Sequence, residues 1–166
     1  KEAKTVITPF MSAAWKGLAP AQEDVMAVRV STTYSKELLT SVAKTITTLD
    51  GNKKFLKKID KLIEDRRKMF FEKNSLDWAM GELLAYGSLL EEGFDVRISG
   101  QDVERGTFSH RHAVLKVEAS EEEVVLLSQL SDKQGKFRIY NSLLSEYGVV
   151  GFDYGYAMAS PNTLTI

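Results

Sequence analysis

The stretch from residue 76 to residue 99 constrains the fold most, because a buried helix runs directly into a strand. Residues 76–92 predict a helix that is apolar on nearly all sides, which indicates burial on more than one face. Gly93 ends this helix, and residues 94–98 then alternate apolar with polar side chains as a β-strand does. A helix buried on several sides beside a strand predicts a layered α/β fold.

The remaining patterns extend this prediction in both directions. Upstream, Ser35 is a good N-cap for a helix that Asp50 and Gly51 end, and a second helix is expected over 53–73. Downstream, strands are expected at 113–117, 137–140 and 163–166, and helices at 121–130 and 145–160. Helices followed by alternating strands and helices predict a mostly parallel sheet.

The two ends of the chain indicate a piece of a larger protein. Residues 1 to about 30 lack periodicity and contain Pro9 and Pro20, which predicts a linker over a neighbouring surface or, alternatively, a partly disordered tail. The chain begins without methionine and stops inside the strand predicted for 163–166.

The composition excludes several classes of protein. Apolar residues make up 43% and charged residues 27% of the chain, as in soluble globular proteins. The net charge of -1 argues against nucleic acid as a partner. No apolar run approaches the roughly 20 residues of a membrane helix. Without cysteine, neither a disulfide framework nor a thiolate zinc site is expected.

Polar groups are dense in the segment 99–112, which directly follows the strand predicted at 94–98. In open α/β sheets, ligands bind beyond the carboxyl ends of strands. Both histidines of the chain, His110 and His112, flank Arg111 here. No third ligand stands at a suitable spacing, so no metal site is predicted. A role near a functional site and a hydrogen-bonded structural loop remain as alternatives.

A second notable segment is 141–157, where Gly148, Gly151 and Gly155 recur on about one helix face. Glycine destabilises a helix, so three of them predict close backbone packing against another helix or a cofactor. Glu146 falls in the first turn of the predicted helix. Its carboxylate either compensates the helix dipole or belongs to a site.

Three blocks resemble the E1 component of 2-oxoglutarate dehydrogenase: Asp77–Glu82, Ser99–His112 and Leu144–Tyr156. The resemblance covers 74–166 closely and the rest loosely. It implies a transketolase-like homodimer in which thiamine diphosphate and Mg²⁺ lie between domains of the two subunits. Residues 1–73 would be a linker and helical segment, and residues 74–166 the N-terminal half of the pyrimidine-binding domain.

The resemblance also implies roles for particular residues. Glu146 matches the glutamate that hydrogen-bonds the aminopyrimidine ring of the cofactor and exchanges a proton with it. Gln101 and Leu144 match positions that line the aminopyrimidine pocket. His110, Arg111 and His112 either shape the substrate channel or brace the loop. The ligands of Mg²⁺ are expected outside this chain.

The implied enzyme decarboxylates 2-oxoglutarate and passes the succinyl group to a lipoyl arm of its E2 partner, dihydrolipoyl succinyltransferase. The chain alone is expected to be inactive and to associate through an uncovered sheet edge. A cytoplasmic bacterial enzyme is expected, with the mitochondrial matrix as the alternative location. The rival hypothesis is a non-enzymatic interaction module, which the tyrosines and phenylalanines of 147–156 permit.

Overall fold

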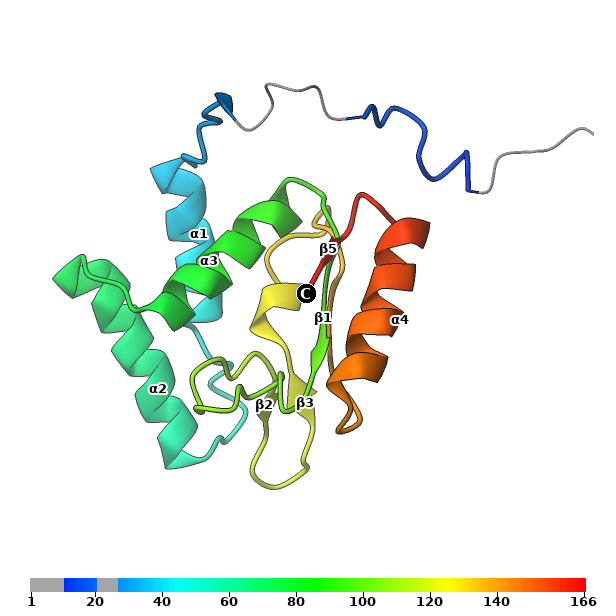
Figure 1. Cartoon of the computed structure of the whole chain (residues 1–166). Helices are drawn as coiled ribbons and strands as arrows, with labels where there is room; N and C mark the ends of the chain where they lie inside the picture. Colours follow the sequence, from blue (N-terminus) through cyan, green and yellow to red (C-terminus); the bar gives the residue numbers. More distant parts are fainter. Residues whose placement is uncertain (1–10, 21–26) are drawn as a thin grey trace, which may run out of the picture.

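A computed structural model describes residues 11–20 and 27–166 (Figure 1). The segment expected to be a linker therefore lies partly outside the described residues. Within it, the indole Nε1 of Trp15 donates a hydrogen bond of 2.8 Å to the carbonyl oxygen of Met158. This bond places residues 11–20 beside the last turn of helix α4 (Glu146–Ala159).

Among the residues that the structure describes, three α-helices and a π-helix precede the first strand. They are α1 (Lys36–Ile46), α2 (Lys57–Lys68), the π-helix η2 (Met69–Lys73) and α3 (Trp78–Glu91). Polar N-caps start α1, α3 and α4, because the side chains of Ser35, Asp77 and Ser145 each accept a bond from a backbone N–H three residues later. Ser35 is confirmed as a cap, and the helix expected from residue 76 begins at Trp78, directly after its cap Asp77.

A three-stranded parallel sheet forms the centre of the molecule. Strand β1 (Val96–Gly100) pairs with β4 (Phe137–Asn141) on one side and with β5 (Leu164–Thr165) on the other, giving the order β4-β1-β5. Both pairings are parallel, which confirms the α/β class with a mostly parallel sheet. Figure 1 shows this sheet between α3 on one side and α4 on the other.

The pleat of β1 sends its side chains to two different environments. Val96 and Ile98 are almost fully buried in the core, which lies on the side of α1, α2 and α3. Arg97 and Ser99 point the other way, toward α4. By contrast, α4 has no buried residue, so its outer surface carries exposed side chains.

The helix expected from residue 53 begins only at Lys57, so this boundary was wrong. Lys53 closes a turn with Asp50, and Phe55 forms an isolated antiparallel bridge with Val117. The N–H of Glu118 donates to the carbonyl oxygen of Lys54 at 2.9 Å. Phe55 is only 4% exposed, so burial of its ring in the core outweighs the helical periodicity of the segment.

The helix expected over 121–130 is also wrong. Strand β3 (Glu123–Val124) pairs antiparallel with β2 (Leu115–Lys116), and a 3-10 helix η3 (Leu126–Ser128) follows. The strand expected over 113–117 is thus shorter and lies outside the parallel sheet. Val124, Leu126 and Leu127 are all buried, because this short hairpin covers the core with side chains that a helix would direct elsewhere.

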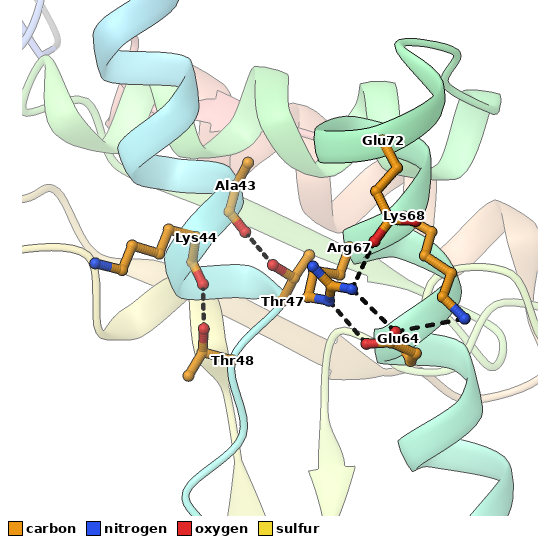
Figure 2. A network of polar contacts seen from close by, with 8 residues as sticks. All are labelled: Ala43, Lys44, Thr47, Thr48, Glu64, Arg67, Lys68 and Glu72. Carbon is orange, nitrogen blue, oxygen red and sulfur yellow. Dashed lines mark hydrogen bonds and ion pairs between the residues drawn. The ribbon is translucent and has the colours of Figure 1, made fainter.

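Helix α1 ends three residues earlier than its apolar pattern suggested. The hydroxyl groups of Thr47 and Thr48 donate to the carbonyl oxygens of Ala43 and Lys44, each at 2.7 Å (Figure 2). These bonds satisfy carbonyl groups at the end of the helix. The chain can then leave the helical path at Ile46.

The contact between α1 and α3 requires glycine at position 87. A Cβ atom built on Gly87 would overlap the side chain of Val42, whereas a Cβ on Gly81 of the same helix meets nothing within 4 Å. We expect Gly87→Ala to lower the free energy of unfolding by about 1–3 kcal/mol through overpacking. Gly81→Ala should raise it by about 0.5–1 kcal/mol. Urea unfolding measures both, and equal effects of the two variants would contradict this account of Gly87.

Candidate functional site

A cavity of about 180 Å³ lies where β1 and β4 end and α4 begins. Its walls combine the backbone of the strand ends with the first turns of the helix, and they are formed by Gly100, Gln101, Ser142, Leu143, Ser145, Glu146, Val149 and Val150. Gln101 and Glu146, which were predicted separately from the sequence, thus line one cavity. It occupies the edge at which α/β sheets bind ligands.

The local structure at the start of α4 directs Glu146 to this cavity. Ser145 caps the helix by accepting a bond of 3.3 Å from the N–H of Gly148, and a Cβ at Gly148 would lie 3.2 Å from the same hydroxyl oxygen. Glu146 is the first helical residue and is exposed. Its side chain therefore stands at the partial positive charge of the helix N-terminus.

Leu144 lies outside the cavity that Gln101 and Glu146 line. Its side chain is 77% exposed and does not line the cavity. The three-glycine face of α4 is also open, since a Cβ at Gly151 or Gly155 meets no described atom within 4 Å. Leu144 and this glycine face are therefore both accessible to partners of the chain.

The loop after β1 turns from the cavity toward α2 and α3. The guanidinium Nη2 of Arg66 donates to the carbonyl oxygens of His110 at 2.9 Å and Arg111 at 2.5 Å. Arg111 in turn donates from Nε to Glu82 and from Nη1 to the carbonyl of Val103, at 2.5 and 2.8 Å. His110, Arg111 and His112 are therefore packed against helices and do not line the cavity with Gln101 and Glu146.

His112 lies in a buried and positively charged environment. The residue is 9% exposed, and burial is the main cause that lowers the pKa of its imidazole below the ordinary value of 6.5. The positive charges of Arg66, Lys58 and Arg105 lower this pKa further. The neutral imidazole is therefore the form that the fold favours.

A buried ion pair fixes α4 against the sheet. Arg97 of β1 is 8% exposed, and its Nη1 donates to a carboxylate oxygen of Asp153 at 2.5 Å and to the hydroxyl of Ser99 at 3.0 Å. The guanidinium carbon also lies 4.8 Å from the ring centroids of both Phe152 and Tyr156, within the range of cation–π attraction. Asp153 stands two turns after Glu146 in α4. The ion pair between Arg97 and Asp153 therefore also fixes the helix that carries Glu146.

Sequence reasoning missed Arg66, Arg97 and Asp153. In the alternating pattern of its strand, Arg97 seemed to belong to a solvent-exposed polar face. Parallel sheets are covered on both faces, and this rule could have indicated that Arg97 is buried. Asp153 gave a weaker signal, as a carboxylate inside an otherwise apolar helix. Arg66 stands on the apolar face of its helix, three residues after Ile63 and four before Phe70, and this position was the available signal.

The described residues contain neither a metal-binding cluster nor a membrane-spanning helix. Across residues 11–20 and 27–166, no cluster of three or more histidine, cysteine, aspartate or glutamate side chains could hold a metal ion. In the same part of the chain, no helix has the length and apolar character needed to span a bilayer.

Comparison with known proteins identifies the family. Residues 74–166 match the model of the transketolase pyrimidine-binding domain, and the chain belongs to this family. It is 41% identical over 159 residues to the mitochondrial 2-oxoglutarate dehydrogenase of Schizosaccharomyces pombe, covering 95% of this chain and 16% of that protein. The 2-oxoglutarate dehydrogenase E1 component of Coxiella burnetii is 42% identical over 159 residues, covering 96% and 16%. The chain thus spans a small part of these relatives.

The environment of His112 predicts a pH effect on stability. Because its pKa is lower in the folded chain, the unfolded chain binds a proton first as the pH falls through about 6.5. The stabilisation from neutral His112 is therefore complete above pH 6.5 and is lost at lower pH. We expect the C2-proton resonance of His112 to titrate below 6.5, and His112→Asn to reduce the loss of unfolding free energy between pH 7.5 and 5.5. Titration of His112 at or above 6.5 would contradict this prediction.

Removal of the buried carboxylate should destabilise the chain. Asp153→Asn leaves Arg97 buried without its counter-charge, and we expect the free energy of unfolding to fall by about 3 kcal/mol. This value is at the lower end for broken buried pairs because both side chains keep some exposure. Glu64→Gln is the control, since Glu64 forms an exposed pair with Arg67 (Figure 2) and should change stability much less. Urea unfolding compares them, and a loss for Asp153→Asn no larger than the control would refute the role of the pair.

Proposed function

We propose that this chain is part of the E1 component of a 2-oxoglutarate dehydrogenase, an oxidoreductase that acts on a 2-oxo acid with thiamine diphosphate as cofactor. Its relatives carry that name, and the matched domain is a pyrimidine-binding domain. Residues 1–73 would form the linker and helical segment, and 74–166 the first half of the pyrimidine-binding domain.

One structural observation carries the proposal for the site. Gln101 and Glu146 line the same cavity, together with Val149 and Val150. A mostly apolar cavity with a few residues that can form hydrogen bonds suits a flat heteroaromatic ring with nitrogen atoms at its edge. These residues fit the aminopyrimidine half of thiamine diphosphate, while its phosphates and Mg²⁺ would be bound by other parts of the enzyme.

In this proposal the residues position the ring and move a proton. When bound, thiamine diphosphate supplies the nucleophilic carbon that adds to a 2-oxo acid. Glu146 would share a proton with a ring nitrogen, and such charge-assisted hydrogen bonds contribute roughly 1.5–3 kcal/mol. Proton transfer of this kind typically accelerates a reaction by about 10²–10⁴-fold. Gln101 and Leu144 would orient the ring from neighbouring positions.

The proposal extends to partners and location. The chain would work with the rest of E1, with a second E1 subunit and with the dihydrolipoyl succinyltransferase E2, to whose lipoyl arm the succinyl group passes. The named relatives include bacterial and mitochondrial proteins. We place this protein in the bacterial cytoplasm, with the mitochondrial matrix as the alternative.

One observation favours a second candidate, a non-enzymatic interaction module. Tyr147, Phe152 and Tyr154 of α4 are 94%, 58% and 70% exposed, and aromatic side chains are enriched in interfaces. The same exposure is expected if α4 packs on missing parts of an enzyme. Activity that depends on Glu146 separates the two candidates.

The decisive test is Glu146→Gln in the full-length protein. We expect 2-oxoglutarate-dependent reduction of an artificial electron acceptor, with thiamine diphosphate added, to fall by about 100-fold or more, because the side chain can no longer exchange a proton. Glu37→Gln is the matched control, since Glu37 is a first-turn carboxylate of α1. Wild-type turnover of Glu146→Gln would reduce Glu146 to a dipole-compensating charge and refute the proposed site.

A further inference from the structure

The loop 101–112 has a backbone conformation that is costly to maintain. Asp102, Ser109 and His112 have φ values of 51°, 53° and 41°, and Gly106 has 82°. Residues other than glycine rarely adopt this left-handed region. The buried His110 Nδ1 and His112 Nε2 also have no hydrogen-bond partner among the described residues. Such a conformation persists only where surrounding contacts impose it.

Arg66 of α2 supplies the most buried of these contacts. It is 3% exposed, no carboxylate of the described chain pairs with it, and burial lowers its pKa to about 10. Its bonds to the carbonyl oxygens of His110 and Arg111 satisfy a group that is otherwise expensive to bury. Because both acceptors are main-chain atoms, Arg66 fixes the path of the loop backbone.

Backbone hydrogen bonds connect the residues that Arg66 contacts to residues nearer the start of the loop. The N–H groups of Arg111 and His112 both donate to the carbonyl oxygen of Arg105 at 2.9 Å, and Ala113 donates to that of Glu104 at 2.8 Å. Glu104 in turn binds the amide side chain of Asn141 at 3.0 Å, at the end of β4. The segment held by Arg66 is therefore bonded to Glu104 and Arg105, three and four residues after Gln101.

We propose that Arg66 is a positioning residue that holds loop 101–112 in the conformation that presents Gln101 to the cavity. This inference rests on the proposed function, in which Gln101 binds the aminopyrimidine ring. Arg66 lies upstream of the matched domain at 74–166. Helix α2 thus helps to shape the cofactor site, although it lies outside the matched domain.

Arg66→Met in the full-length protein tests this role, with Arg67→Met as the matched control. Arg67 is the next residue of α2, but it is partly exposed and pairs with Glu64 and Glu72 (Figure 2). For Arg66→Met we expect amide hydrogen exchange in 101–112 to accelerate about 10-fold or more. Thiamine diphosphate affinity should fall about 10-fold because preorganisation is lost. Turnover at saturating cofactor should stay within about 2-fold of wild type, and Arg67→Met should match wild type throughout.

The outcomes separate this inference from the proposed function. Faster exchange with unchanged cofactor affinity, while Glu146→Gln is inactive, would mean that Arg66 is only structural and that the proposed function stands. Unchanged exchange would overturn the inference directly. Wild-type activity of Glu146→Gln would refute the proposed site, and with it a cofactor role for Arg66. If Arg66→Met fails to fold, Arg66→Lys decides by the same measurements, because its side chain keeps the charge but ends about one bond short of the Nη2 atom that donates to both carbonyl oxygens.

Discussion

The pairing of Arg97 with Asp153 is the interaction on which the position of α4 depends. Arg97 is the second residue of β1, and its neighbours Val96 and Ile98 are buried in the core on the opposite face of the sheet. The guanidinium must therefore be satisfied on the α4 side, and Asp153, Ser99 and the aromatic rings of α4 do this. The helix has no buried apolar residue of its own, so a polar contact orients it on the sheet.

The candidate site follows from this geometry. The parallel strands β1 and β4 end at the same edge, and α4 starts there because Ser145 caps it directly after the loop that leaves β4. Gln101 at the end of one strand and Glu146 at the start of the helix consequently line one cavity. Glu146 stands on a helix, whereas Gln101 is the first residue of loop 101–112, so precise positioning of a ring requires that this loop be held in place.

The loop 101–112 shows how a site can depend on residues that never touch it. Its left-handed residues and unpartnered imidazole nitrogens are local violations of ordinary backbone and hydrogen-bond rules. Arg66, Arg111 and Glu82 compensate from α2, the loop and α3. Such compensation is typical of functional regions, where local sequence preferences and tertiary structure disagree.

The sequence by itself determined the α/β class, the cap Ser35, a strand that follows Gly93 and the family blocks that contain Gln101 and Glu146, because these depend on local periodicity, capping chemistry and motif. Only the tertiary structure decided that α2 begins after the bridge of Phe55 and that 121–130 contains a strand and a 3-10 helix, since burial of Phe55 and Val124 in a distant core overrides local propensity. The tertiary structure alone paired Arg97 with Asp153 and Arg66 with the loop backbone, because each contact joins residues that are far apart in the chain and a local pattern does not name the partner.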